Sequence, residues 1–261
     1  MIRTLLRDIY HRVAPSSVQR ALKPLLHPFI ALARSQVLRH ASGAVISGPF
    51  KGLKFGNAPL SLPIVLGTYE LELHGVFARL ANTNFSRIID VGAAEGYYAV
   101  GTALWKPTCK VVAYEANPIY HKSIQHLAQT NNVQSRLDIK GTCETRDLHD
   151  LGDDLIGALL IVDVEGYEKT LLDPREIPAL RSATILVETH DNFVPGCEAT
   201  IKARFMDSHA ITEFQSRARV ASECPIKTGL ARFRFMDAAF THCISDGRTE
   251  PNGWLLLEPR L

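Results

Sequence analysis

The chain of 261 residues has few of the features that mark secreted, membrane-spanning or strongly charged proteins. Its five cysteines are odd in number and form no C-x-x-C pair, which argues against a disulfide scaffold or a zinc site. No apolar run approaches the roughly 20 residues of a membrane span, and prolines interrupt the most apolar part of the N-terminus. A net charge of +2 is too small to indicate nucleic-acid binding. We therefore expect a cytoplasmic protein.

A second absence concerns redox enzymes. Short-chain dehydrogenases need a catalytic tyrosine with a lysine four residues later, and none of the seven tyrosines here has that partner. That class of dehydrogenase is therefore disfavoured, although the chain carries a glycine-rich segment of the kind that holds nucleotide cofactors.

This segment, Asp90–Gly96, is the strongest functional signal in the sequence. It follows the apolar run Arg87–Ile89, which predicts a buried strand, and precedes Tyr97–Leu104, which predicts a helix. Backbone N–H groups at such a turn lie over a crevice and bind the polar part of a nucleotide-like cofactor. Nineteen residues after Gly96, the next predicted strand ends at Glu115, where an acid binds ribose hydroxyls.

The spacing of the loop favours S-adenosylmethionine over a dinucleotide. In the dinucleotide fingerprint G-x-G-x-x-G, the second glycine lets the pyrophosphate approach the backbone, and Ala94 occupies that position here. S-adenosylmethionine has an adenine and a ribose but no phosphate, so it tolerates the change. The alternative is an ordinary strand–turn–helix whose glycines are incidental.

From Arg87 onward, strand-like and helix-like patterns alternate. Such alternation predicts an α/β fold with a mostly parallel sheet, helices on both faces, and ligands at the carboxyl ends of the strands. The predicted strands are 87–92, 110–115, 136–141, 158–164, 183–189, 210–215 and 254–258, and the predicted helices include 118–130 and 165–172. Upstream, residues 44–56 predict a small hairpin, and Thr68 predicts the N-cap of a helix.

The first 43 residues differ from the rest and predict a basic amphipathic helical extension, followed by a cofactor-binding domain over residues 44–261. Residues 1–40 hold seven lysines and arginines against one acid, Asp8. Helical spacing is shown by the apolar residues Val18, Leu22, Leu25, Phe29, Ala33 and Val37. Pro24 and Pro28 are expected to kink or divide the helix. Such a helix packs on the main domain or in a homodimer, or it makes peripheral contact with a membrane or partner.

Acidic residues and one histidine follow the fourth and fifth predicted strands. Buried carboxylates are costly unless they are paired or bound, so a cluster at a ligand-binding edge favours function. His190 is the expected general base, with Asp163 and Glu165 as further catalytic candidates. Alternatively, Asp163, Glu188 and His190 form a site for Mg²⁺ or Mn²⁺. Glu168 is expected to be solvated.

Three segments make the chain resemble class I S-adenosylmethionine-dependent methyltransferases, and among them the FkbM-like family. They are Ile89–Tyr98, Ala113–Pro118 and Ile161–Glu168, the last with the D-x-E-G-x-E pattern typical of that family. The likeness covers residues 65–192. It implies a Rossmann-like, seven-stranded sheet with one antiparallel strand near its edge, and O-methylation of a hydroxyl on a sugar, glycan or natural product.

The resemblance also implies the cofactor site. It places Glu115 on the ribose, Cys143 or Glu144 near adenine, and Tyr69 and Glu70 at the methionine end. The full expected set is Tyr69, Glu70, Asp90, Gly92, Ala93, Ala94, Glu95, Gly96, Tyr97, Glu115, Ala116, Asn117, Cys143, Glu144 and Asp163.

The expected acceptor is a small molecule or glycan, and no nucleic acid. Amino-methylating nucleic-acid enzymes carry Asn/Asp-Pro-Pro-Tyr after strand four, where this chain has Asp163–Gly166. The Pro-Cys pair of cytosine-C5 enzymes is reversed here, as Cys224-Pro225. The alternative is a non-catalytic scaffold that binds a partner or membrane through its N-terminal helix. A basic wall for an acidic substrate, or else solvated strand edges, is predicted from Arg217, Arg219, Lys227, Arg232 and Arg234.

Overall fold

The computed structural model describes residues 16–56, 58, 60–247 and 253–260, with the side chains of the first helix described from His27 on. Seven strands form one sheet in the order β3-β2-β1-β4-β5-β7-β6, in which β7 is antiparallel to both neighbours. The strands are β1 (Arg87–Val91), β2 (Lys110–Tyr114), β3 (Leu137–Lys140), β4 (Leu159–Val162), β5 (Thr184–Thr189), β6 (His209–Gln215) and β7 (Gly253–Pro259). The α-helices are α2 (Ser16–Ala41), α3 (Leu62–Leu66), α4 (His74–Leu80), α5 (Tyr97–Trp105), α6 (Pro118–Thr130), α7 (Thr145–Leu151), α8 (Glu168–Leu171), α9 (Cys197–Phe205) and α10 (Asp237–Ile244).

The central strands are apolar throughout because both faces of the sheet are covered. Alternate side chains point to opposite faces, so Ile88 belongs to the core shared with α4, α5 and α6, whereas Ile89 belongs to the core shared with α7, α8 and α9. Leu159 and Leu160 divide in the same way. The predicted mostly parallel sheet with helices on both faces is therefore confirmed, including the antiparallel strand near its edge.

Helix boundaries follow local signals. The predicted helix 118–130 coincides with α6, where the Asn117 side chain caps the helix by accepting the Ile119 N–H at 3.1 Å. The predicted helix 165–172 is shorter in the structure, because Glu165 and Gly166 have φ values of +52° and +107° that a helix cannot contain. α8 therefore begins only at Glu168.

Two upstream predictions differ from the structure. Thr68 is not an N-cap: its buried hydroxyl donates to the Pro63 carbonyl at 3.4 Å, and a short 3-10 helix, Leu71–Leu73, leads into α4 instead. The hairpin expected over 44–56 is reduced to one antiparallel bridge, between Ala44 and Lys54.

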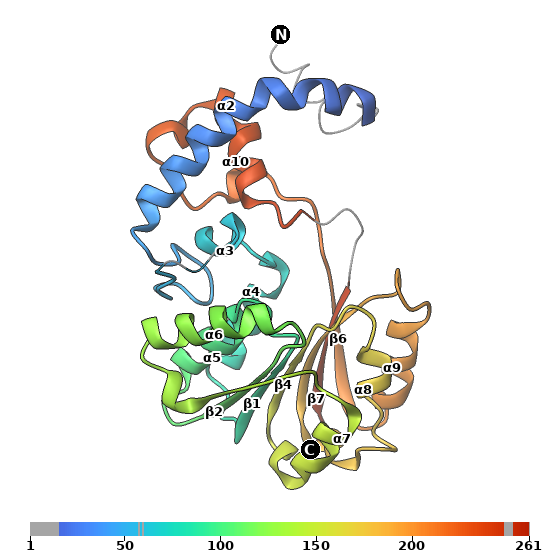
Figure 1. Ribbon diagram of the computed structural model, residues 1–261. Coiled ribbons are helices and arrows are strands. Elements are labelled where there is room, and N and C mark those ends of the chain that lie inside the picture. The colour runs from blue at the N-terminus through green and yellow to red at the C-terminus, as the bar shows by residue number, and fades with distance from the viewer. Residues whose placement is uncertain (1–15, 57, 59, 248–252, 261) are drawn as a thin grey trace.

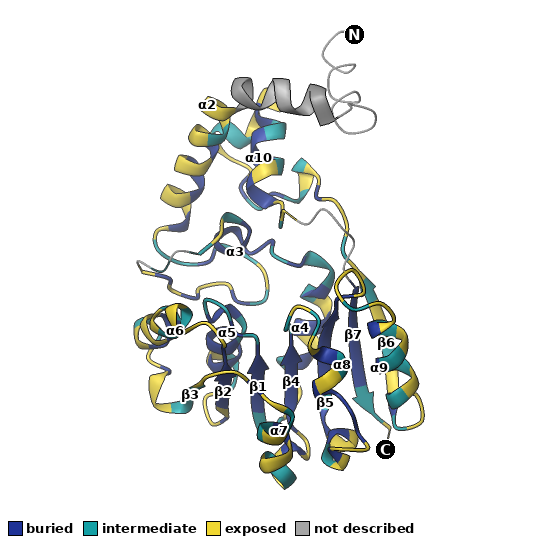
Figure 2. Ribbon diagram, turned by 45° about the vertical axis from the view of Figure 1, so that its right-hand side comes forward, coloured by how far each residue is buried: buried dark blue, intermediate teal, exposed yellow. Residues whose placement is uncertain are grey.

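The remaining elements form a second layer, which we call the cap and define as residues 16–67 and 216–247. In Figure 1, α2, α10 and α3 lie together above the sheet, and Figure 2 shows β1 and β4 pointing toward them. Ala33 and Val37 of α2 and Phe240 of α10 belong to the same core as α4, α5 and α6, so the helix does pack on the main domain. The domain division at residue 43 stays a prediction.

α2 runs without interruption from Ser16 to Ala41, so the two prolines within it do not divide it. The ribbon nevertheless bends along its length (Figure 1), as a proline inside a helix favours. Within the described ranges, no helix combines the length and apolar character needed to cross a membrane.

Candidate functional site

The glycine loop between β1 and α5 is held against the tips of two neighbouring strands. The N–H groups of Gly92 and Ala93 both donate to the Tyr114 carbonyl, at 2.9 and 3.0 Å. Gly92 has a φ of +88°, and a Cβ added there would lie 1.7 Å from the carbonyl oxygen of Asp163. Only glycine fits this approach to β4, so the first glycine of the predicted motif has a physical reason.

Glu115 lies at the tip of β2, beside this loop, as predicted. It is 9% exposed; one carboxylate oxygen accepts the Ala94 N–H at 2.8 Å and the other accepts the Asn117 N–H at 2.7 Å. Ala94 itself has a φ of +44°, a conformation that residues other than glycine seldom adopt. The structure therefore brings together the predicted ribose-binding acid and the predicted cofactor loop.

Asp90 is a buried carboxyl group below the loop. Burial raises its pKa to about 7, a shift that the Ala99 N–H opposes and the nearby charge of Glu115 reinforces. Among the described residues its Oδ2 atom has no hydrogen-bond partner. The base of the loop therefore holds a carboxyl that is partly protonated at neutral pH.

Tyr69, Glu70 and Tyr97 gather on the cap side of the loop. Glu70 is buried, with a φ of +46°, and its carboxylate accepts a hydrogen bond from the Tyr98 hydroxyl. The rings of Tyr69 and Tyr97 lie 6.1 Å apart. The cap reaches the site here, because the Glu70 N–H donates to Asp246, which follows α10, at 3.3 Å.

The predicted adenine-side residues follow β3. Burial, with the charges of Asp147 and Glu144, raises the pKa of the Cys143 thiol to about 12, so it is a neutral apolar group. Glu144 caps α7 and accepts a hydrogen bond from the Tyr167 hydroxyl at 3.3 Å. Tyr167 follows β4, so this bond joins the segment after β3 to the segment after β4.

The most buried polar contact of the site joins Glu168 to His190. The two side chains are 0% and 1% exposed, and Glu168 Oε1 lies 2.6 Å from His190 Nδ1. The same oxygen accepts the N–H groups of Val164 at 3.3 Å and Gly166 at 3.1 Å. The prediction that Glu168 is solvated is wrong, because the positive-φ turn before it directs the first residue of α8 inward.

The second ring nitrogen of His190 faces the other acids of the cluster. His190 Nε2 lies 3.3 Å from Glu165, 3.6 Å from Asp163 and 3.9 Å from Glu188. Burial lowers the pKa of His190, but the hydrogen bond and charge of Glu168, with the charges of Glu188 and Asp163, outweigh it and raise the pKa to about 8. The residues predicted to be catalytic are thus brought together.

Three residues of this cluster lie close enough together that they could hold a metal ion. Asp163, Glu165 and His190 each offer a ligand atom within 4.8 Å of the others. The metal set predicted from the sequence contained Glu188 in place of Glu165. In the structure the Glu165 carboxylate lies nearer to His190 Nε2 than the Glu188 carboxylate does, at 3.3 Å against 3.9 Å. A carboxylate on the other imidazole nitrogen, as Glu168 provides, is the usual outer partner of metal-binding histidines.

The predicted basic wall does not form as one surface. The Arg219 side chain is buried between Glu72, at 2.7 Å, and Asp246, at 2.5 Å. Arg217 pairs with Glu223. Arg219 therefore links the cap to the 3-10 helix before α4, whereas Arg232 and Arg234 are exposed on the cap.

Sequence reasoning missed Glu168 and Tyr98 as parts of the site. A signal for Glu168 was present, since Gly166 marks a break in the helix and so determines where the following helix begins. Tyr98 carries no such signal, because only the tertiary contact with Glu70 distinguishes it from any other helical tyrosine.

The comparisons with known proteins bear on the fold. A candidate O-methyltransferase from Klebsiella pneumoniae aligns with a TM-score of 0.51 and 13% identity, covering 93% of this chain and 96% of that one. The O-methyltransferase TomG from Streptomyces achromogenes, involved in tomaymycin synthesis and solved with S-adenosylmethionine, gives 0.46 and 13%, covering 88% and 89%. The B. subtilis tRNA methyltransferase TrmK gives 0.44 and 11%, covering 69% and 64%.

No family model and no curated protein sequence matches the chain. The strand order, the antiparallel β7 and the Klebsiella structure agree on one architecture. The chain has the Rossmann-like fold of class I methyltransferases.

Proposed function

We propose that the protein is an S-adenosylmethionine-dependent methyltransferase that methylates a hydroxyl oxygen of a small molecule or glycan. The observation that carries the proposal is the fixed position of Glu115, whose carboxylate lies against the glycine loop through the Ala94 N–H. Within class I we propose the FkbM-like family, supported by the Ile161–Glu168 segment, whose last residue forms the buried pair with His190.

The residues present fit the cofactor. A carboxylate with two oxygens at a strand tip suits the two ribose hydroxyls, and Gly92 lets the loop lie close against the Asp163 carbonyl. Tyr69 and Glu70 would lie at the methionine end, and Cys143 and Glu144 near adenine. When bound, S-adenosylmethionine supplies an electrophilic methyl group on a sulfonium.

His190 is the proposed general base. An alcohol must lose its proton as it accepts a methyl group, and a base near neutral pKa does this most effectively. Glu168 holds the Nδ1–H, which fixes the tautomer of the neutral ring. Because the pKa of His190 is raised to about 8, Nε2 becomes a proton acceptor only as the ring is deprotonated, so base catalysis should increase as pH rises toward 8. In this proposal Glu168 is a positioning residue, and His190 is the group that takes the proton of the acceptor.

A divalent cation is a second candidate for the same role, favoured by the ligand geometry of Asp163, Glu165 and His190. Mg²⁺ or Mn²⁺ held there would lower the pKa of the acceptor hydroxyl. Metal analysis of the purified protein, with activity measured before and after chelation, separates the two versions. Full activity in a metal-free, chelated protein would remove the cation.

The cofactor site is tested by calorimetric titration with S-adenosylhomocysteine, beside NAD. Loss of a charged hydrogen-bond partner costs about 1.5–3 kcal/mol, so Glu115→Ala should weaken binding roughly tenfold to a hundredfold. Glu176→Ala removes an exposed carboxylate outside the site and should bind normally. If the folded wild-type protein does not bind the homocysteine product, the scaffold alternative takes precedence.

The base is tested by labelled methyl transfer to a panel of sugars, glycans and hydroxylated natural products. With an acceptor found, His190→Ala should lower kcat by about 10²–10⁴ while binding of S-adenosylhomocysteine is kept. Glu168→Gln should lower kcat less, since it keeps a hydrogen-bond acceptor. Unchanged kcat in His190→Ala would remove the proposed base without affecting the cofactor site.

A further inference from the structure

Two segments of the cap carry positive charge and no acidic residue. They are residues 27–41 of α2 and residues 224–236, the stretch that precedes α10. Their exposed cations are Arg34, Arg39, Lys227, Arg232 and Arg234. A soluble surface normally mixes both signs of charge. Here the flanking acids are Glu223, which pairs with Arg217, and Asp237, so the exposed cations outnumber the acids and favour a negative partner.

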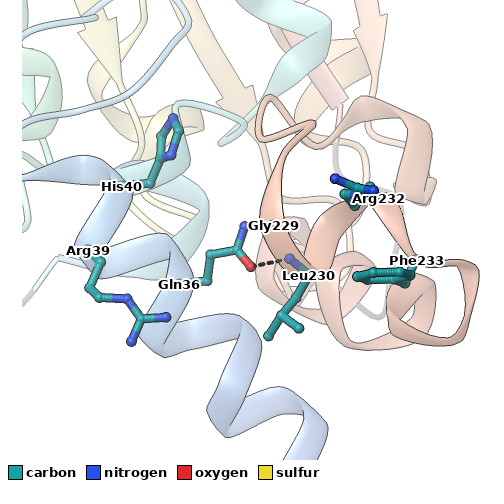
Figure 3. A pocket seen from close by; sticks show the side chains of 7 residues that line it. All are labelled: Gln36, Arg39, His40, Gly229, Leu230, Arg232 and Phe233. Atoms are coloured by element: carbon teal, nitrogen blue, oxygen red, sulfur yellow. Dashed lines mark hydrogen bonds between the residues drawn. The ribbon is translucent and has the colours of Figure 1, made fainter.

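The two segments form one surface because a buried glutamine joins them. Gln36 of α2 donates to the Thr228 carbonyl at 2.7 Å, and its oxygen accepts the Leu230 N–H at 2.8 Å (Figure 3). Gly229 has a φ of +60°, and a Cβ there would lie 2.8 Å from the Gln36 amide nitrogen. The 224–236 stretch is therefore fixed against α2.

Aromatic side chains are exposed on this surface. Phe29 is 38% exposed, Phe233 44% and Phe235 64%, although burial is the usual state of phenylalanine. Phe235 contacts both of the others, with ring centroids 6.3 Å from Phe29 and 5.6 Å from Phe233. Leu32, one turn after Phe29, is 51% exposed and extends the apolar stripe along α2, whose outer face is coloured as exposed in Figure 2.

A groove of about 640 Å³ lies between the two segments. In Figure 3, Arg39 and His40 line it from α2, whereas Arg232 and Phe233 line it from the opposite side. The Arg232 guanidinium lies 5.4 Å from the centre of the Phe233 ring. Cations on both walls beside an aromatic ring suit a phosphate whose attached chain is apolar.

We propose that this surface docks on an anionic phospholipid membrane. We define the surface as Phe29, Leu32, Arg39, Arg232, Phe233 and Phe235. Phenylalanine and leucine enter the boundary between headgroups and acyl chains, while arginines remain at the level of the phosphates, and this combination is typical of interfacial helices. The excess of cations over acids matches the negative potential of such a membrane. No residue of the surface belongs to the candidate active site.

The test is flotation of the full chain with vesicles of phosphatidylcholine alone and with added phosphatidylglycerol. We expect binding only to the anionic vesicles, and release at high salt, because screening weakens contacts between surface charges and lipid. Arg39→Glu with Arg232→Glu, and separately Phe233→Ser with Phe235→Ser, should each reduce binding by about tenfold or more.

The matched control is Lys110→Glu with Arg260→Glu. It makes the same change in charge at two exposed positions, one where β2 begins and one just after β7 ends. Both lie at the strand ends that face away from the cap. It should bind as the wild type does, and thermal melts should show all variants folded. The proposal is overturned if the wild type does not float with anionic vesicles, or if the control loses binding equally. It is also overturned if light scattering shows a dimer that the phenylalanine variants dissociate while vesicle binding is absent.

Discussion

Different kinds of interaction stabilise the sheet and the cap. The sheet core is built from fully buried aliphatic side chains such as Ile89, Leu160 and Val187. The cap adds polar ties between distant segments, with Gln36 bonded to residues 228 and 230 and Arg219 placed between Glu72 and Asp246. One region is stabilised chiefly by apolar area, and the other depends in addition on individual partners.

This difference predicts how each region responds to change. Apolar burial is non-directional and sums over many contacts, so the sheet does not depend on any one partner. Removal of one member of a buried ion pair leaves the other charge uncompensated. We therefore expect the cap to open locally before the sheet unfolds, and the following variants test that order from the largest effect to the smallest.

Gly92→Ala should cause the largest loss, because it changes the sheet through its backbone. The new Cβ would lie 1.7 Å from the Asp163 carbonyl oxygen, at a φ of +88°. We expect a loss of more than about 4 kcal/mol in the free energy of unfolding, measured by chemical denaturation. The control is Gly141→Ala, where nothing lies within 4 Å of the added Cβ. An equal effect at both glycines would contradict the close-approach explanation.

Asp90 is the polar exception within the sheet and should make stability depend on pH. Its pKa is about 7 in the folded protein against 3.8 for an unperturbed carboxyl. Between these values the folded state keeps a proton that the unfolded state has released, so stability falls as pH rises from about 4 to about 7. At about 1.4 kcal/mol per pKa unit, the change is on the order of 4 kcal/mol.

Asp90→Asn should flatten this pH dependence, as followed by urea unfolding at several pH values. Asp207→Asn, at an exposed position, should leave the slope unchanged. If the slope is the same in the wild type and in Asp90→Asn, the buried carboxyl is not its source.

The same contrast explains what the sequence predicts well. The strands were placed to within two residues because a sheet buried on both faces requires continuous apolar runs, as in Leu159–Val162. The loop and Glu115 were predicted because their chemistry depends on a strand-to-helix turn, which is local. Such patterns can be read along one stretch of chain.

The parts that escaped prediction depend on contacts between distant residues. Arg219 appeared to belong to a basic wall, but its partners are 147 positions earlier and 27 positions later in the sequence. Glu168 was predicted to be solvated, but it is buried because Glu165 has a positive φ. A residue with a side chain seldom adopts a positive φ, so the sequence does not reveal this turn. Neither partner choice nor backbone strain is visible in composition or periodicity.

Arg219→Met tests the cap side of the comparison. It leaves Glu72 and Asp246 without their cation, and breaking such a buried pair typically costs about 3–5 kcal/mol. We expect about 3 kcal/mol, with hydrogen exchange increased in α10 more than in β4. Arg181→Met, at an exposed arginine beside the sheet, is the control. Global unfolding without a preceding increase in cap exchange would show that cap and sheet form one cooperative unit.

Gln36→Leu should cause the smallest loss of stability. It tests the contact between α2 and residues 228–230 of the cap. The leucine keeps the bulk of the side chain but leaves the Thr228 carbonyl and Leu230 N–H without their partner, at a cost of about 1–3 kcal/mol. We expect a loss near 1 kcal/mol, since water can reach these groups through the adjoining groove. Exchange should rise in residues 228–236 while the titration with S-adenosylhomocysteine is unchanged, because Gln36 is bonded to Thr228 and Leu230 and not to a residue of the proposed cofactor site. Weaker cofactor binding in this variant would mean that the groove and the active site are coupled through the cap, and the comparison between an apolar sheet and an independently opening cap would then fail.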